Sequence, residues 1–367
     1  MNPRLLLIVL LLVFSLLLTL PVAAQDDLPA WEDLPAEEWT QIMPGGDTIC
    51  SIGTPYAFFV RPADAPSDKL AIYLQGGGAC WFGDICSLNV NPTFDPFVDD
   101  SDEPGAGGIF DYENPENPVA DYNVVFLPYC TADVHLGQME GSYTTSAGDE
   151  VTIFHQGHTN VMTVLDWTFA EAPEPSMVFV AGSSAGSIPS PFYTEFVAEA
   201  YPEARVVQLG DGSGGYRNPP LATAVFTAWG TMDILTDLYE GITVDELTFE
   251  SFYTQVGAAL PNVTFSAYNT AYDDVQIGFL QIGGLADFDL WELLQANYAD
   301  ILEADPDFVS FTAGGELHTI LGRPELYTYA ADGVRFVDWL TDLLAGETVE
   351  TVDCGESCDA PEIIESE

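Results

Sequence analysis

Short apolar runs recur along the chain, separated by polar turns rich in glycine and proline. Runs of this length without alternation are typical of strands buried on both faces of a sheet. Between them lie longer stretches whose apolar residues recur every three or four positions, which predicts helices. The predicted strands span residues 56–60, 70–74, 124–127, 177–181, 206–209, 263–268 and 308–312, and the predicted helices span 161–170, 191–201, 285–302 and 334–344.

This alternation predicts an α/β fold with a mostly parallel central sheet and helices on both faces. Residues 221–260 interrupt the alternation, and we expect them to form a mostly helical cap insertion over the functional site. Residues 99–117 are acidic and rich in glycine, proline and asparagine, so we expect a long loop that borders the same site.

The N-terminus resembles a secretory signal peptide. Arg4 precedes an apolar run over residues 5–20, and small residues follow as far as Ala24, after which cleavage is expected. The alternative is an uncleaved membrane anchor, because the run is only slightly short for a spanning helix. We expect an acidic segment at 25–49, one α/β domain at 50–346 with the cap at 221–260, and an acidic, cysteine-containing tail at 347–367.

Charge changes the picture of possible partners. The chain carries 58 acidic and seven basic residues, a net charge of −51, and loss of Arg4 with the signal peptide makes it −52. Nucleic acid and anionic lipid both require basic patches, so neither is an expected partner. Divalent cations at the acidic surface are a possible partner, and the run from Asp99 to Glu103 could hold calcium, although its spacing matches no calcium-loop motif.

Six cysteines in a chain with a secretion signal predict up to three disulfides. We favour the local pairs Cys80–Cys86 and Cys354–Cys358, which leave Cys50 to pair with Cys130. A zinc site is the alternative, but no cysteine and histidine cluster has the usual zinc spacing.

The pentapeptide Gly182-Ser183-Ser184-Ala185-Gly186 directly follows a predicted strand and precedes a predicted helix. Gly-x-Ser-x-Gly in this setting is the pattern of a nucleophile elbow, in which a sharp turn lifts the central serine out of the sheet. Ser184 is therefore the candidate nucleophile. An ordinary tight turn after a strand is the alternative.

A serine hydroxyl needs a base, most often histidine, to remove its proton. His318 follows the last predicted core strand, where an α/β-hydrolase places its base. We expect His155 and His158 to cap or pack at the start of a helix, and His135 to line the pocket. The alternative for His318 is a surface loop histidine.

The acid that orients the histidine must come between Ser184 and His318 in chain order. Asp211 follows the strand at 206–209 and Asp273 follows the strand at 263–268. The order of residues does not decide between them.

A glycine-rich segment follows the strand at 70–74 and comprises Gly76, Gly77, Gly78, Ala79, Cys80 and Trp81. Its backbone N–H groups could turn toward a substrate oxygen, with the N–H of Ala185 as the second part of an oxyanion hole. The alternative is a phosphate-binding loop, but no lysine follows the glycines.

These motifs together resemble the pectin acetylesterase/Notum family of serine carboxylesterases, and most closely its bacterial secreted members. The resemblance runs from about residue 53 to 318 and on toward 344, and its motifs appear in family order. They are LQGGGACW at 74–81, NPENPVADYNVVFLPYCTADVHLG at 114–137, GSSAG at 182–186, NTAYDDVQI at 269–277 and GGELHTI at 314–320.

The resemblance implies Ser184 as nucleophile, His318 as base and Asp273 as acid, with Asp211 as a supporting residue. It also implies oxyanion donors at Gly78, Ala79 and Ala185, and a pocket formed or supported by Gly76, Gly77, Trp81, Asp133 and His135. Several family members have an aromatic residue where this chain has Ala79. Animal Notum proteins have more cysteines, so their disulfide scheme does not carry over.

From this resemblance we expect a secreted esterase that removes acetyl or other acyl groups from an acylated polysaccharide such as pectin, or from a small acyl ester. No cofactor or metal ion is expected, and no membrane partner after signal cleavage. The alternatives are a Notum-like lipid or protein deacylase and a non-catalytic acidic binding protein. Because de-esterified pectin is a polyanion, the negative surface favours neutral or heavily esterified substrates, or pectin bridged by divalent cations.

Overall fold

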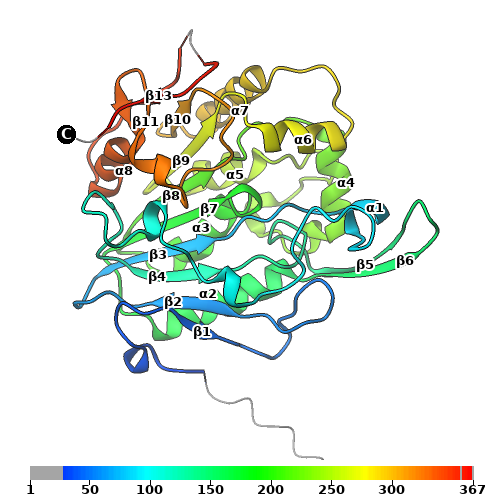
Figure 1. Ribbon diagram of the computed structural model, residues 1–367, viewed down its shortest axis with the longest axis horizontal. Coiled ribbons are helices and arrows are strands. Elements are labelled where there is room, and N and C mark those ends of the chain that lie inside the picture. The colour runs from blue at the N-terminus through cyan, green and yellow to red at the C-terminus, as the bar shows by residue number, and fades with distance from the viewer. Residues whose placement is uncertain (1–27, 356–357, 366–367) are drawn as a thin grey trace, which may run out of the picture.

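One twisted sheet runs through the computed structural model, which describes residues 28–355 and 358–365 (Figure 1). Its eight strands are β1 (Thr40–Ile42), β2 (Phe58–Arg61), β3 (Lys69–Leu74), β4 (Asn123–Leu127), β7 (Met177–Ser183), β8 (Arg205–Asp211), β9 (Val263–Thr270) and β10 (Val309–Ala313). Their order across the sheet is β1-β2-β4-β3-β7-β8-β9-β10, and β2 runs opposite to the other seven strands. The α/β-hydrolase-like fold with a mostly parallel sheet is therefore confirmed.

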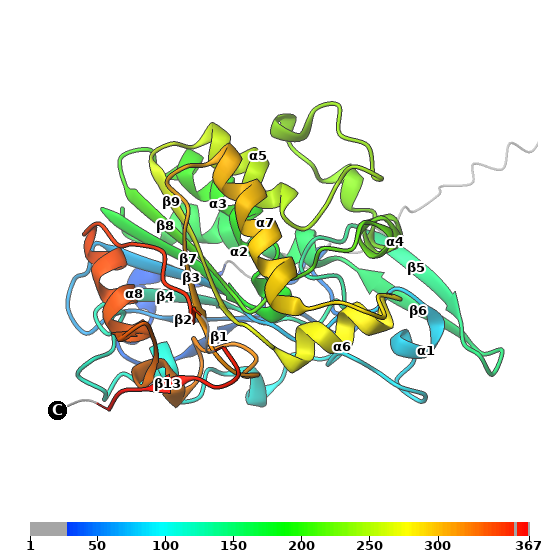
Figure 2. The same ribbon diagram turned by 90° about the horizontal axis from the view of Figure 1, so that it is seen from above.

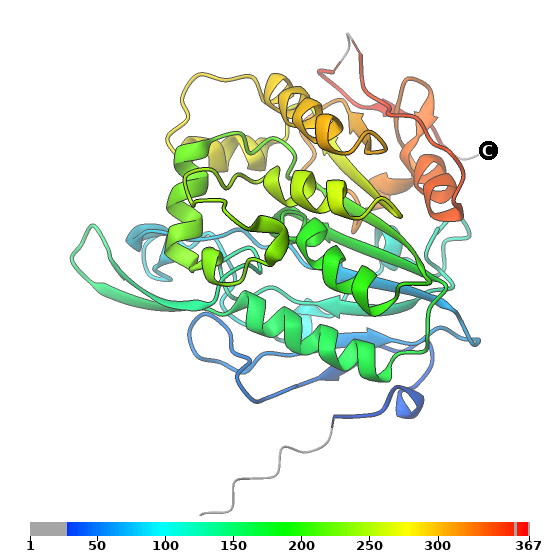
Figure 3. The same ribbon diagram turned by 180° about the vertical axis from the view of Figure 1, so that it is seen from behind.

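The helices cover the two faces of the sheet unequally. One face carries α2 (Gly157–Glu171), α3 (Ser190–Ala200), α5 (Ser251–Ala259) and α7 (Leu290–Ala304), as Figure 3 shows from behind. The other face carries α8 (Phe336–Ala345) together with short turns and loops (Figure 2). Three helices lie toward the carboxyl ends of the strands: α1 (Gly83–Cys86), α4 (Pro219–Trp229) and α6 (Asp274–Ile282).

The continuous apolar runs of the sequence arise because the central strands are buried on both faces. In β3, Ile72 and Leu74 belong to the hydrophobic core beneath the larger helical layer, whereas Ala71 and Tyr73 belong to the core beneath α8. Both faces exclude water, so neither set of positions alternates with polar residues. Within the described residues, no helix combines the length and hydrophobicity required to cross a membrane.

Several elements differ from the sequence-based expectation. The hairpin of β5 (Met139–Thr144) and β6 (Glu150–His155) was not predicted, because its half-exposed strands carry few apolar residues. His155 consequently ends a strand rather than starting a helix. The segment 221–260 is helical only in α4 and α5, with loops and the short 3-10 helices η5 (Thr231–Asp233) and η6 (Asp237–Tyr239) between them.

The ends of the described chain are tied into the domain. The edge strand β1 comes from the predicted acidic segment at 25–49. In the predicted acidic tail, β13 (Glu362–Ile363) joins β11 (Tyr329–Ala331) and β12 (Val334–Arg335) in a small sheet, and Val352 bridges to Phe311. The predicted signal peptide, residues 1–24, lies outside the described residues.

Three disulfides join Cys50 to Cys130, Cys80 to Cys86 and Cys354 to Cys358, the pairing favoured from the sequence. The first closes a separation of 80 residues, and the last closes only four. Because a crosslink restricts the unfolded chain more when it closes a longer loop, the three bonds contribute unequally to stability.

Replacement of both Cys50 and Cys130 by alanine is expected to lower the free energy of unfolding by about 4 kcal/mol, on the loop-entropy estimate. Urea unfolding under non-reducing conditions measures this loss. The matched control is the double alanine variant of Cys354 and Cys358, for which the same estimate gives about 2 kcal/mol. A control loss as large as that of the Cys50–Cys130 variant would contradict the prediction.

Candidate active site

The turn after β7 holds Ser184 in a strained conformation. Its φ is +54°, in the left-handed region that non-glycine residues rarely adopt. The flanking glycines permit this turn, since a Cβ on Gly182 would lie 2.1 Å from the carbonyl oxygen of Gly186, and one on Gly186 would lie 2.1 Å from that of Leu74. This strand-turn-helix geometry agrees with a nucleophile elbow.

The glycine-rich segment after β3 packs directly against this turn. A Cβ on Gly76 would lie 2.8 Å from the Cβ of Ser184, and one on Gly78 would collide with the carbonyl oxygen of Thr93. Gly78 also has a φ of +78°. Within the described part of the chain, the N–H groups of Gly78 and Ala79 donate no hydrogen bond, so both remain available to an oxygen atom entering the site.

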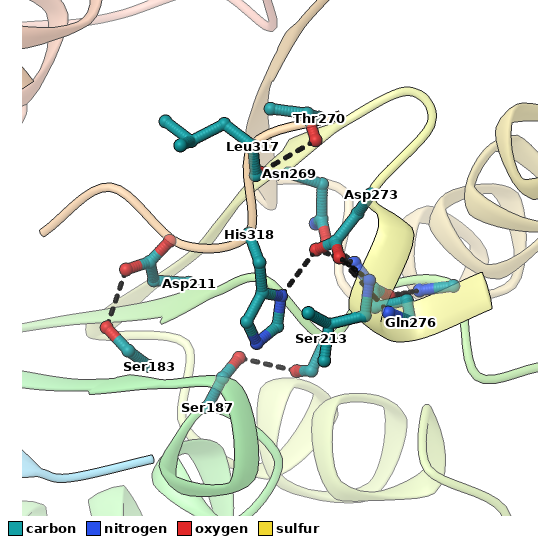
Figure 4. A network of polar contacts seen from close by, with 12 residues as sticks. Ser183, Ser187, Asp211, Ser213, Asn269, Thr270, Asp273, Gln276, Leu317 and His318 are labelled. Carbon is teal, nitrogen blue, oxygen red and sulfur yellow. Dashed lines mark hydrogen bonds and ion pairs between the residues drawn. The ribbon is translucent and has the colours of Figure 1, made fainter. Parts of the chain in front are cut away.

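His318 and Asp273 are joined by a hydrogen bond of 2.7 Å between Nδ1 and Oδ2 (Figure 4). Asp273 is fully buried at the N-cap of α6, where its other oxygen accepts the N–H groups of Val275 and Gln276. The Gln276 side chain donates to Oδ2 at 2.9 Å, which further fixes the carboxylate. The second ring nitrogen of His318, Nε2, is buried without a hydrogen-bond partner among the described residues.

Asp211 holds a different position from the one expected of a catalytic acid. Its buried carboxylate accepts hydrogen bonds from the N–H groups of Ile320 and Leu321, at 3.0 Å each, and from the Ser183 hydroxyl at 2.6 Å. It therefore ties the loop that carries His318 to the residue immediately before Ser184. Figure 4 shows the bond between Asp211 and Ser183. Burial raises the pKa of Asp211 to about 6, although these three donors favour its charged form.

Asp133 and His135 lie behind the glycine-rich segment rather than in the pocket. The buried Asp133 carboxylate accepts from the Thr131 hydroxyl and from the N–H groups of His135 and Gly157, so it holds a loop with three left-handed residues, Ala132, Val134 and His135. His135 Nε2 lies 2.9 Å from the carbonyl oxygen of Gln75. The buried ring of His135 packs against Tyr129, and His135 is not among the residues that line the cavity beside Ser184, so its supporting role stays a prediction.

His155 and His158 are packing residues. His155 lies within hydrogen-bond distance of Tyr143 and of the Thr131 carbonyl, and His158 stacks on Tyr193. Burial lowers the pKa of each to about 4, so both are neutral near pH 7. Within residues 28–355 and 358–365, no cluster of three histidine, cysteine or carboxylate residues has a metal-binding arrangement.

A small apolar cavity of about 40 Å³ lies beside Ser184. Five of the residues that the sequence predicted for the site line this cavity: Gly78, Ala79, Trp81, Ser184 and Ala185. Gly76 and Gly77 are not among its lining residues. The sequence analysis did not identify the other wall residues, which come from the loops and from the expected cap: Val134, Ile188, Tyr216, Leu221, Val225, Trp229, Phe249 and Phe279. It also missed Gln276, although a glutamine three residues after a helix-capping Asp273 is a recognisable capping pattern.

Residues 43–310 match the pectinacetylesterase family. The chain belongs to the pectinacetylesterase family. It is also 32% identical over 93 residues to a palmitoleoyl-protein carboxylesterase, NOTUM, from Schmidtea mediterranea, a match that covers 24% of this chain and 18% of that protein. The chain thus aligns with less than a fifth of that relative's length.

The raised pKa of the buried Asp211 carboxyl group predicts how this residue contributes to the pH dependence of stability. Its pKa is higher in the folded protein than the ordinary aspartate value of 3.8, so the folded state binds more protons between about pH 4 and 6. The contribution of this group to the free energy of unfolding therefore falls as pH rises across that interval and is lost above about pH 6. Asparagine at position 211 has no titrating group. Between pH 4 and pH 6, the change in the free energy of unfolding of the Asp211→Asn variant should therefore lack this fall of roughly 2 kcal/mol.

Urea unfolding at pH 4 and pH 6 measures this difference. The surface variant Asp64→Asn is the control and should show the same decline as the unchanged protein. If Asp211→Asn declined equally, the carboxyl group would not titrate in this range in the folded protein.

Proposed function

We propose that this pectinacetylesterase-family member is a secreted serine esterase that removes short acyl groups, foremost acetyl, from an extracellular polysaccharide. The observation that carries the proposal is the buried Asp273–His318 hydrogen bond at the same end of the sheet as a left-handed Ser184. Three disulfides and the signal-like N-terminus support secretion.

In the proposed reaction, Ser184 Oγ attacks the ester carbonyl carbon while His318 Nε2 takes its proton. The free Nε2 of His318 suits it as the proton acceptor. Asp273 fixes the tautomer with the proton on Nδ1 and stabilises the imidazolium that forms. His318 then returns the proton to the leaving alcohol, which departs and leaves an acyl group on Ser184. Water, deprotonated by the same nitrogen, then attacks the acyl carbon, and His318 returns that proton to Ser184 Oγ as the acid leaves.

The negative oxygen of the tetrahedral intermediate would be stabilised by the backbone N–H groups of Gly78, Ala79 and Ala185. The free N–H groups of Gly78 and Ala79 and the close approach of this segment to Ser184 support this assignment. Donors that are fixed before the reaction are effective because no reorganisation is needed when the charge develops.

The cavity beside Ser184 favours a short acyl group. Its volume is about 40 Å³ and its wall is mostly apolar. A Notum-like deacylase of long-chain lipid is the second candidate, favoured by the partial match to NOTUM, but it requires a much deeper apolar cavity. The strongly negative chain further favours an uncharged or highly esterified polymer over a bare polyanion, unless divalent cations screen the repulsion.

Ser184→Ala is expected to lower kcat on p-nitrophenyl acetate by about four orders of magnitude or more, since the attacking oxygen is lost. The variant should also lose covalent labelling by a fluorophosphonate probe. Ser183→Ala is the matched control and should remain labelled, because the Ser183 hydroxyl is hydrogen-bonded to Asp211 and Tyr73. Labelling of the Ser184→Ala variant would refute the acyl-enzyme proposal.

The size of the cavity predicts the acyl-chain preference. On p-nitrophenyl esters, kcat/KM should fall about ten-fold or more from acetate to octanoate, because the longer chain does not fit without displacing wall residues. Val225→Ala enlarges the cavity and should raise kcat/KM for octanoate relative to kcat/KM for acetate. Faster hydrolysis of octanoate than of acetate by the unchanged protein would instead support the long-chain deacylase.

A further inference from the structure

The acidic residues are distributed unevenly around the candidate site. The chain contains 58 acidic residues in 367, yet residues 70–94, 212–232 and 275–286 contain a single one, Asp84. These three segments supply most of the wall of the cavity beside Ser184. Asp84 Oδ1 accepts the N–H of Ser146 in the β5–β6 turn, so this carboxylate already has a partner. Acidic residues resume directly after each segment, at Asp95, Asp233 and Asp287.

Two of these segments, 70–94 and 275–286, expose large apolar side chains. Phe82, Leu88, Val90, Val275 and Ile282, here called the uncharged rim, are each between 36% and 46% exposed. They are five of the eleven large apolar side chains exposed on the described part of the chain. The rest, which include Leu302 and Val334, belong to other segments of the fold.

Ring contacts connect the rim to the cavity. The rings of Phe82 and Trp81 lie 5.6 Å apart and those of Trp81 and Phe279 6.5 Å apart, and both Trp81 and Phe279 line the cavity. Val275, Phe279 and Ile282 recur at four- and three-residue spacing, so they share one side of α6. Figure 2 shows α6 and α1 at the same end of the molecule.

The loop between α1 and residue 94 is fixed to the candidate oxyanion segment. The Thr93 hydroxyl donates to the carbonyl oxygen of Ala79, and the Thr93 carbonyl lies where a Cβ on Gly78 would be. Leu88 and Val90 are therefore carried by a loop that packs on the wall of the cavity. An exposed apolar surface next to a catalytic cavity is a common sign of a binding surface.

We propose that the uncharged rim binds the surface of an electrically neutral, densely acetylated polysaccharide, so that acetyl methyl groups neighbouring the scissile ester contact Phe82, Val275 and Ile282. This inference rests on the proposed esterase function and specifies its substrate class. Contact with several acetyl groups favours densely acetylated regions over isolated esters, because each buried methyl group adds to the free energy of binding.

The charges of the chain favour a neutral polymer. The segments contain one basic residue, Arg217, and it is already paired with Glu250 and Asp300. A polyanion would therefore find no free cation in these segments and would be repelled by the surrounding acidic residues. A neutral lipid surface also lacks charge, but the small size of the cavity favours a short acyl group over a long chain.

The test compares Phe82→Ser and Ile282→Ser with Leu302→Ser and Val334→Ser, which replace apolar residues of similar exposure elsewhere. The substrates are glucomannan of high and of low acetyl content and p-nitrophenyl acetate. The measured quantity is a ratio: kcat/KM on highly acetylated glucomannan divided by kcat/KM on p-nitrophenyl acetate. In each rim variant this ratio should fall about three- to ten-fold. This ratio should not change in the two controls, and the fall should be smaller on sparsely acetylated glucomannan.

Three results would overturn the inference: an unchanged ratio in both rim variants, an equal fall in the controls, or a larger fall on emulsified tributyrin, which would indicate a lipid surface. Faster hydrolysis of acetylated polygalacturonate than of acetylated glucomannan at low salt would also contradict it. Failure of the proposed function is distinct, because then the unchanged protein would neither hydrolyse p-nitrophenyl acetate nor react with a fluorophosphonate. If the rim variants hydrolyse p-nitrophenyl acetate and the ratio of the two kcat/KM values does not change, the esterase proposal stands and only the binding role of the uncharged rim is refuted.

Discussion

The close packing of the glycine-rich segment after β3 against the turn at Ser184 is the constraint on which the rest of the site depends. Gly76, Gly182 and Gly186 each occupy positions where a Cβ would lie within 2.5 Å of a backbone oxygen. The three glycines let two adjacent strand ends meet with no side chain between them. Ser184 adopts its left-handed conformation at this contact, and the two unpaired N–H groups belong to the same glycine-rich segment. Neighbouring parallel strands place both segments at one edge of the sheet.

A second layer of buried polar groups holds the other loops to this contact. Asp211 connects the loop after His318 to Ser183, Asp273 fixes the imidazole, and Asp133 supports the loop behind the glycine-rich segment. In each case a carboxylate with no access to solvent accepts backbone N–H groups, those of a loop for Asp211 and those of the first turn of α6 for Asp273. Such buried acceptors are expensive to leave unsatisfied, so they give irregular segments a defined geometry that apolar packing alone would not impose.

The sequence predicted the central strands well because continuous apolar runs flanked by glycine have few other interpretations. It also supplied Ser184, Asp273 and His318 as candidates, and the structure brings the last two into contact. Their roles, and those of the oxyanion donors, stay predictions. Local patterns did not choose between Asp211 and Asp273, because the choice depends on which carboxylate faces the imidazole. The β5–β6 hairpin and most of the cavity wall were missed for a related reason: Tyr216, Phe249 and Phe279 acquire their positions only through contacts distant in sequence.

Two of the disulfides lie directly on the segments that shape the cavity. Cys80 stands between Ala79 and Trp81, and Cys130 precedes the loop in which Ala132, Val134 and His135 are left-handed. A newly made chain with free thiols lacks both fixed points, and its strained loop is held by hydrogen bonds alone. The geometry of the cavity wall therefore depends on thiol oxidation, which takes place in oxidising compartments and not in the reducing cytosol.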